Sequence, residues 1–276
     1  MILAVGLAFV PESPRWLVEK KHPQKALEVL TEINGDEQAQ KEVKEITASI
    51  AEETGTFSEL FKTGVKGALI VAVGLALFQQ FCGGFALNVY APTIFMKAGF
   101  PDPSKAIGLT VFLAGFNLLM VAIVIWLVER LGRKPLLIIG VSGMAVGHVI
   151  LWLCFKFGLE GFYVPLVVVL TNGFSNLSIS HLAWVIMPEI FPTRVRVKGM
   201  AIATFIVWGG SYATAQFFPP MADFCEKTFG SPGAVFLLFG ITSLLGVIFI
   251  WRMVPETKGR TLEAIGSFWL HKKDNL

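Results

Sequence analysis

The sequence predicts an all-α membrane protein, and three observations support this fold class. Only 16% of the 276 residues are charged and 54% are hydrophobic, whereas soluble domains carry about a quarter charged residues. The apolar residues gather in stretches of about 20, the length that a helix needs to cross the hydrocarbon core of a bilayer. Short charged segments separate these stretches. A chain with this pattern is expected to cross the membrane several times.

The first 66 residues precede the complete spans and divide into two parts. Residues 1–10 are apolar but too short to span, and they lack the basic start and cleavage site of a signal peptide. They are expected to be the end of a preceding transmembrane helix whose beginning is missing. Residues 11–66 place apolar side chains at helical spacing between Lys and Glu, which predicts a cytoplasmic linker of short amphipathic helices. Asn34-Gly35-Asp36 predicts a break between two of them.

Residues 67–254 are expected to form a bundle of six transmembrane helices, followed by a cytoplasmic tail over 255–276. The predicted spans are 67–95, 107–128, 136–155, 163–187, 200–221 and 233–254. Gly, Ser and Ala are frequent within them, for example at Gly140, Gly143 and Gly147. Small residues allow helices in lipid to approach closely, so we expect these glycines to serve packing.

The charges of the connectors predict the orientation and exclude some partners. Arg and Lys gather after the second, fourth and sixth spans, while the alternate connectors hold few of them. By the positive-inside rule these basic connectors and the C-terminus are cytoplasmic, and we expect a multi-pass protein of the cell (inner) membrane. The basic residues flank spans and form no single patch, so no nucleic-acid partner is predicted. Cys82, Cys154 and Cys225 are too widely spaced to indicate a metal site or a disulfide framework.

Four cytoplasmic segments carry a resemblance to a known family. They read PESPRWL at 11–17, ERLGRK at 129–134, PEIFP at 188–192 and VPETKGRTLE at 254–263. In this order and at this spacing they resemble the signatures of the sugar porter family of the major facilitator superfamily. The resemblance covers essentially the whole chain and identifies it as the six-helix C-terminal half plus the cytoplasmic linker. GLALFQQ at 74–80 and YAPTIF at 90–95 most resemble the bacterial proton-coupled xylose and glucose porters.

The resemblance implies transport of a sugar or sugar-like small polar solute by alternating access, as part of a twelve-helix porter. It implies no enzymatic activity, no cofactor and no metal. The partners that it implies are the solute, the lipid bilayer, the missing N-terminal six-helix half and, as a candidate, protons. The proton-linked carboxylate of the bacterial porters belongs to that N-terminal half, so proton symport and facilitated diffusion both stay open.

Charged residues at the cytoplasmic helix ends predict a latch. Glu and Arg on neighbouring helices can form charge-assisted pairs that close the inner side of a porter while it faces outward. The alternative is that these residues only anchor helix ends and set the topology. The predicted latch residues are Glu129, Arg130, Arg133, Glu189, Arg196 and Glu256.

Uncharged polar side chains at bilayer depth predict the solute site, because lipid-facing positions penalise them. A neutral sugar needs hydrogen bonds from amides or hydroxyls and an apolar or aromatic wall. The resemblance assigns these roles to Gln79, Gln80, Asn117, Trp208, Trp184 and Tyr90. A purely structural role between helices stays open for each of them.

Several positions depart from the family pattern. Phe85 stands where the family has Asn, Val89 replaces the first Tyr of a pair, and Val207 replaces an amide before Trp208. Ile179 stands where the bacterial porters have Trp, and Ser180-His181 replaces a Gly-Pro hinge. Asn88 lies at a different helical angle from position 85, so it is not assumed to replace the missing amide. The cavity is therefore expected to be more apolar, and a non-sugar solute is plausible.

His181 is a candidate proton or substrate contact, because an imidazole within a span can carry a proton. The alternative is a histidine bonded to a helix carbonyl. A sugar sensor is an alternative to a transporter. A sensor of this family is expected to have a long cytoplasmic tail, and only a short segment follows Val254-Pro255-Glu256 in this sequence. A non-transporting truncated fragment is a further alternative, since one half alone is not expected to transport.

Overall fold

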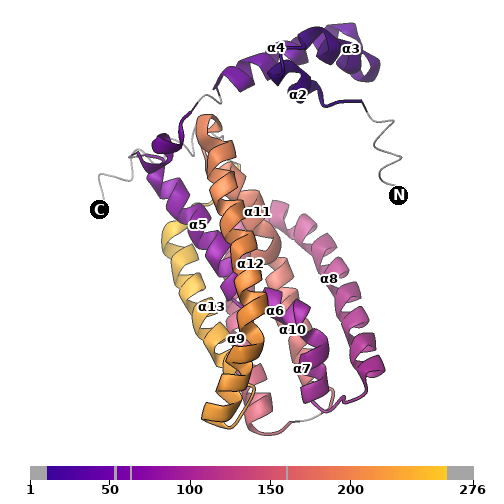
Figure 1. Cartoon of the computed structure of the whole chain (residues 1–276), viewed down its shortest axis with the longest axis vertical. Helices are drawn as coiled ribbons and strands as arrows, with labels where there is room; N and C mark the ends of the chain where they lie inside the picture. The colour runs from indigo at the N-terminus through magenta and orange to yellow at the C-terminus, as the bar shows by residue number, and fades with distance from the viewer. Residues whose placement is uncertain (1–10, 53–54, 63, 160, 260–276) are drawn as a thin grey trace. The chain divides into compact units, whose positions relative to one another are not determined.

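The computed structural model describes residues 11–52, 55–62, 64–159 and 161–259. Within these ranges the chain is helical and divides into two units (Figure 1). Unit 1 comprises Met1–Glu59 with Thr193–Val197, and unit 2 comprises Leu60–Pro192 with Lys198–Leu276. The predicted ends of the chain, residues 1–10 and most of the tail, lie outside the described residues.

Unit 1 contains the predicted amphipathic helices: α2 (Pro14–Glu19), α3 (Pro23–Asn34) and α4 (Asp36–Glu52). α2 and α3 each begin with proline, whose fixed φ suits the first helical position and whose missing N–H is not needed there. Gly35 separates α3 from α4 with φ +80°, a left-handed value that favours glycine. The predicted break is therefore confirmed. The side chains buried among the three helices include Leu17, Ala26, Leu30 and Ala39.

Unit 2 is a helical bundle, preceded by the short 3₁₀ helix η1 (Phe57–Phe61). Its helices are α5 (Lys66–Phe81), α6 (Gly84–Val89), α7 (Ala91–Lys97), α8 (Pro103–Leu131), α9 (Arg133–Lys156), α10 (Tyr163–Leu177), α11 (Ile179–Glu189), α12 (Thr193–Phe229, of which the first five residues belong to unit 1) and α13 (Ala234–Met253). α9 packs against α13 and α10, α10 packs against α8, and α11 packs against α5. The bundle is thus held together by contacts between segments far apart in the sequence.

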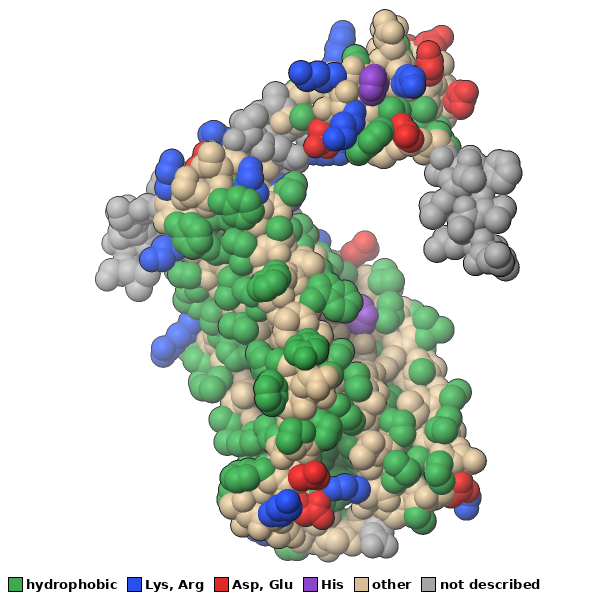
Figure 2. Space-filling model, in the orientation of Figure 1, with side chains coloured by type: hydrophobic (Ala, Val, Ile, Leu, Met, Phe, Trp, Pro, Cys, Tyr) green, Lys and Arg blue, Asp and Glu red, His purple; other side chains and the backbone are tan. Residues whose placement is uncertain are grey.

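Five stretches among the described residues are long and apolar enough to cross a membrane, judged by length and composition. They are Lys66–Val89, Pro103–Leu131, Arg133–Lys156, Tyr163–Glu189 and Ala234–Met253. The sixth predicted span lies within α12, whose 37 residues extend about 55 Å. α12 is not among the five stretches, because Ser211, Thr214 and Gln216 make the predicted span itself less apolar than the others. In Figure 2 hydrophobic side chains cover the length of the bundle.

The first predicted span is interrupted at Cys82 and Gly83, between α5 and α6. Gly83 has φ +88°, and a Cβ there would lie 2.7 Å from the ring of Phe239, so only glycine fits. The break frees backbone carbonyls, which cannot be left without hydrogen bonds in lipid. His148 Nε2 donates to the Cys82 carbonyl at 2.8 Å, and Thr242 Oγ1 donates to the Phe81 carbonyl at 2.8 Å. α9 and α13 therefore stabilise the irregular backbone of the break.

The fourth span is interrupted at Ser178, between α10 and α11. Ser178 has φ −132° and ψ −105°, and its hydroxyl donates to the Phe174 carbonyl at 2.7 Å. α9 approaches this break closely, since a Cβ on Gly140 would lie 2.2 Å from the Ser178 side chain. The glycine-rich face of α9 thus packs against the α10–α11 segment, as small residues do in membrane helices.

Candidate functional site

The amides of Gln79 and Gln80 lie in the last turn of α5 and are more than nine-tenths buried. Gln79 Nε2 donates to the Ser180 carbonyl at 2.9 Å, while its Oε1 has no hydrogen-bond partner among the described residues. Gln80 Oε1 accepts from Ser211 Oγ at 3.0 Å. The two neighbouring amides therefore connect α5 with α11 and with α12.

Asn117 belongs to a chain of amides that crosses three helices. Asn176 Nδ2 on α10 donates to Asn117 Oδ1 on α8 at 2.9 Å, and Asn117 Nδ2 donates to Asn88 Oδ1 on α6 at 2.9 Å. The chain starts at Asn172, whose Oδ1 and carbonyl accept from Asn176 Nδ2 at 2.6 and 2.9 Å. It ends where Asn88 Nδ2 donates to the Gly84 carbonyl at 2.9 Å. We call Asn172, Asn176, Asn117 and Asn88 the asparagine chain.

His181 and the serines of the α10–α11 segment connect the glutamines to the asparagine chain. The half-buried His181 places its Nδ1 2.9 Å from the Asn176 carbonyl, and since a carbonyl only accepts, Nδ1 carries the hydrogen of this bond. Ser180, which accepts from Gln79, shares a hydrogen bond of 2.8 Å with Ser175. Hydrogen bonds thus link the polar groups of α5, α6, α8, α10 and α11 into one cluster.

The three predicted aromatic residues are more exposed than the glutamines or bond to other groups. Trp208 on α12 is 67% exposed and Trp184 on α11 is 37% exposed, so the helices of unit 2 leave part of each side chain uncovered. Tyr90 donates its hydroxyl hydrogen to the Ala215 carbonyl, and its ring stacks on Phe218 with the centroids 4.7 Å apart. Tyr90 therefore fastens the start of α7 to α12.

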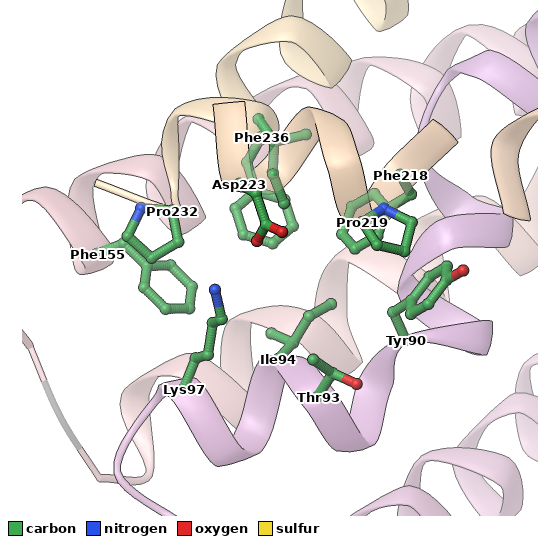
Figure 3. Close-up of a pocket in the computed structure, with 12 residues that line it drawn as sticks. Tyr90, Thr93, Ile94, Lys97, Phe155, Phe218, Pro219, Asp223, Pro232 and Phe236 are labelled. Atoms are coloured by element: carbon green, nitrogen blue, oxygen red, sulfur yellow. The ribbon is translucent and has the colours of Figure 1, made fainter. Parts of the chain in front are cut away.

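Tyr90 lines a cavity of about 200 Å³ between α7, α9, α12 and α13 (Figure 3). Its wall is largely apolar and includes four aromatic rings, and Lys97 and Asp223 point toward the same space. Lys97 Nζ pairs with the Glu226 carboxylate at 2.8 Å. None of the glutamines or asparagines described above lines this cavity, so it is separate from the predicted solute site.

At the end of the bundle where α9 begins, here called the arginine end, two of the predicted latch residues form an ion pair. Arg133 Nη2 lies 3.3 Å from Glu189 Oε1, and both side chains are about three-quarters buried. Nε of Arg133 and Oε2 of Glu189 are buried without a hydrogen-bond partner in the described part of the chain. The pair joins α9 to α11 and keeps further hydrogen-bonding capacity.

Glu256 caps the start of α9 from the segment that follows α13. Its carboxylate accepts from the backbone N–H of Arg133 at 3.1 Å, of Lys134 at 3.0 Å and of Lys258 at 2.9 Å. Burial opposes ionisation of this carboxyl, but the backbone N–H groups that it accepts from outweigh burial and lower the pKa of Glu256. An anion at a helix N-terminus is also favoured by the helix dipole.

The remaining predicted latch residues, Glu129, Arg130 and Arg196, are not members of this ion pair. The Arg130 guanidinium lies over the Trp126 ring, 3.9 Å from its centroid. Glu129 is exposed and forms no ion pair with the residues that the structure describes. Arg196 belongs to unit 1, where its Nη2 donates to Thr193 Oγ1 at 3.4 Å.

Asn172, Asn176 and Asn88 belong to one polar chain that the sequence did not predict. Asn172 and Asn176 are four residues apart within a predicted span, so they share a helix face at bilayer depth. The criterion that selected Gln79 and Asn117 applies to them equally. No group of three or more His, Cys, Asp or Glu side chains that could hold a metal ion is found among the described residues.

Comparison with known proteins agrees with this architecture. Residues 1–269 match the model of the family described as "Sugar (and other) transporter". The chain is 34% identical to the arabinose-proton symporter of Bacillus subtilis, with 98% of this chain and 57% of that protein covered. It is also 34% identical to the D-xylose-proton symporter of Escherichia coli, with coverage of 98% and 55%.

Solved structures of the proton:xylose symporter XylE have a similar fold. The complex with 6-bromo-6-deoxy-D-glucose gives a TM-score of 0.76 at 34% identity, over 96% of this chain and 56% of that chain. The inward-open form from E. coli gives a TM-score of 0.75 at 31% identity, over 96% and 53%. The chain thus spans just over half the length of the relatives it matches. It belongs to the sugar transporter family of the major facilitator superfamily.

Proposed function

We propose that this chain is the C-terminal half of a porter that carries a sugar or sugar-like small polar solute across a membrane by alternating access. The other half is a six-helix N-terminal bundle, joined to this chain or assembled with it, and the two together are called the complete porter. The observation that carries the proposal is the set of amides at bilayer depth, Gln79 and Gln80 with the asparagine chain.

These amides suit a neutral, hydroxyl-bearing solute. Each amide both donates and accepts, as each sugar hydroxyl does, so the bonds that the solute loses to water can be replaced. Charged groups are not needed for such a ligand. Trp208 and Trp184 stay exposed in this half, which supports a role as apolar walls facing the solute or the other half.

Closure at the arginine end fits the proposed cycle. Transporters of this superfamily bind between their halves and rock one half against the other. The Arg133–Glu189 pair and the Glu256 cap join α9, α11 and the segment after α13 at one end of the bundle. We propose that this end is cytoplasmic, in a cell (inner) membrane, and that the pair stabilises the state closed to the inside.

The relatives named arabinose-proton and D-xylose-proton symporters support protons as co-substrate. We propose that coupling resides in the N-terminal half, since the His181 Nδ1–H is bonded to the Asn176 carbonyl and serves the α10–α11 break. In this proposal His181 positions Asn176, and the other half supplies the proton site.

Counterflow in liposomes tests the proposal. The complete porter is loaded with unlabelled pentoses, hexoses or polyols, and uptake of the labelled solute is measured with and without a pH gradient. We expect saturable exchange of at least one hydroxyl-bearing solute, and none with this chain alone. Absence of exchange for the whole panel, with both halves inserted, would contradict the proposed function.

A further inference from the structure

Asn117 and Asn88, the two least buried members of the asparagine chain, can each form further hydrogen bonds. A side-chain amide has two donor hydrogens and an oxygen with two acceptor sites. Asn117 uses one hydrogen toward Asn88 and one acceptor site toward Asn176. Asn88 uses one hydrogen toward the Gly84 carbonyl and one acceptor site toward Asn117. Each amide therefore retains one donor and one acceptor among the described residues.

The chain runs from the protein interior to an accessible end. Asn172 is fully buried and Asn176 is 7% exposed, whereas Asn117 is half-buried and Asn88 is exposed. Asn176 Nδ2 has two hydrogens for three oxygens, the Oδ1 and carbonyl of Asn172 and Oδ1 of Asn117, so the nitrogen side of its amide faces all three. This orientation fixes that of Asn117 and then that of Asn88. The buried Asn172 and Asn176 therefore fix the direction in which the Asn117 and Asn88 amides point.

The spacing of the exposed pair has a chemical counterpart. The Asn117 Nδ2 donor and the Asn88 Oδ1 acceptor lie 2.9 Å apart. The oxygens of two neighbouring hydroxyls on a sugar ring or polyol are about one hydrogen-bond length apart when they are gauche. One such hydroxyl can accept from Asn117 while its neighbour donates to Asn88. A solute with an isolated hydroxyl satisfies only one of the two groups.

We propose that Asn88 is a substrate-binding residue that selects solutes with two adjacent hydroxyls, and that Asn176 positions Asn117 for the same contact. This inference rests on the proposed function and names its substrate class. Asn88 supplies an amide on α6, where Phe85 removes the one that the sequence pattern leads us to expect. The loss at residue 85 is thereby compensated from the next turn of the helix.

The test compares Asn88→Leu with wild type in the complete porter, using a transported solute and its analogue that lacks one hydroxyl of the adjacent pair. Leucine keeps the volume and removes both polar groups. We expect KM for the intact solute to rise about tenfold while KM for the deoxy analogue changes less than about twofold, with the maximal rate nearly unchanged. Wild type should discriminate between the two solutes and the variant should not.

Two further variants separate binding from structure. Asn176→Leu should give the same loss of discrimination, to a smaller extent, because Asn117 is then free to rotate. Thr110→Val is the matched control on α8, since among the described residues its hydroxyl bonds to the Ala106 carbonyl of its own helix, at 2.9 Å, and to no other helix. This control should keep the wild-type ratio of KM values. If Asn88→Leu does not reach the membrane, Asn88→Ser replaces it, with an intermediate ratio expected.

The outcomes distinguish the inference from the proposed function. If wild type carries none of the solutes in the panel, both the inference and the proposed function are overturned. A wild-type porter that transports, with an Asn88→Leu variant whose KM is unchanged or is raised equally for both solutes, overturns the inference alone. An equal rise for both solutes would mean that the asparagine chain only holds α8 in place.

Discussion

At the scale of single residues, the ion pair of Arg133 and Glu189 is the contact most directly linked to the proposed transport cycle. The two side chains are partly buried, so their attraction is less screened than that of a surface pair, yet one buried atom of each has no partner in the described chain. The two charges therefore attract each other, while each side chain can still form another hydrogen bond. In the proposed transport cycle the pair can therefore be exchanged for other contacts.

Arg133→Gln is expected to shift the complete porter toward the inward-open state. Removing the guanidinium leaves Glu189 without its ion-pair partner, which destabilises the closed arginine end. The shift is measured as labelling of a single cysteine accessible only from the inside. Lys97→Gln is the matched control, because it breaks an interhelix pair of 2.8 Å away from the arginine end. An unchanged labelling rate for Arg133→Gln would exclude the latch.

Individual polar residues could be predicted from the sequence, but their partners could not. Gln79, Gln80 and Asn117 were selected because polar side chains in spans avoid lipid. Which amide meets Asn117 depends on how α8 and α10 are rotated about their axes, and periodicity within one helix carries no information about this. Asn172 and Asn176 therefore became visible as its partners only in the folded bundle.

At the scale of helices, the sequence predicted the order of the spans well and their interruptions poorly. The predicted span 67–95 consists of α5, α6 and α7. The chain breaks between α5 and α6 because Gly83 adopts a left-handed φ, and His148 donates a hydrogen bond to the freed Cys82 carbonyl. The hydrophobic pattern is continuous across this break. A histidine 66 residues away stabilises it, and no local signal reports such a contact.

Capping of α9 by Glu256 predicts a pH-dependent contribution to stability. The pKa of Glu256 is lower in the folded protein than in the unfolded chain, so its stabilisation is fully present above the unfolded pKa. It is lost as the pH falls through the folded pKa. Glu256→Gln should therefore lower the free energy of unfolding by about 0.5–1 kcal/mol at neutral pH. The difference from wild type should vanish well below about pH 4.

Thermal unfolding of the chain in detergent at several pH values measures this effect. Glu129→Gln serves as control, because Glu129 is exposed at the same end and forms no ion pair within the described chain. A Glu256→Gln difference that persisted at low pH would mean that the cap acts through packing and not through its charge.

At the scale of the whole molecule, the chain has the helical fold of its family and spans just over half the length of the relatives that it matches. It covers 57% of the arabinose-proton symporter and 56% of a XylE chain, and Asn88, Trp184 and Trp208 are exposed. Composition and four short segments were enough to predict this architecture. The solute was not predictable, because the amides proposed to bind it come from several helices whose packing the sequence alone does not give.

The central claim is that the amides of this half bind the solute, and calorimetry on the complete porter tests it most directly. A solute that shows counterflow is titrated into wild type, Gln80→Leu and Thr171→Val. In the described part of the chain the Thr171 hydroxyl bonds to the Val167 carbonyl of its own helix, at 2.7 Å, and to no other helix, so it controls for loss of a buried polar group. We predict that Gln80→Leu weakens binding about tenfold and that Thr171→Val leaves it unchanged. Wild-type affinity in Gln80→Leu would contradict the account.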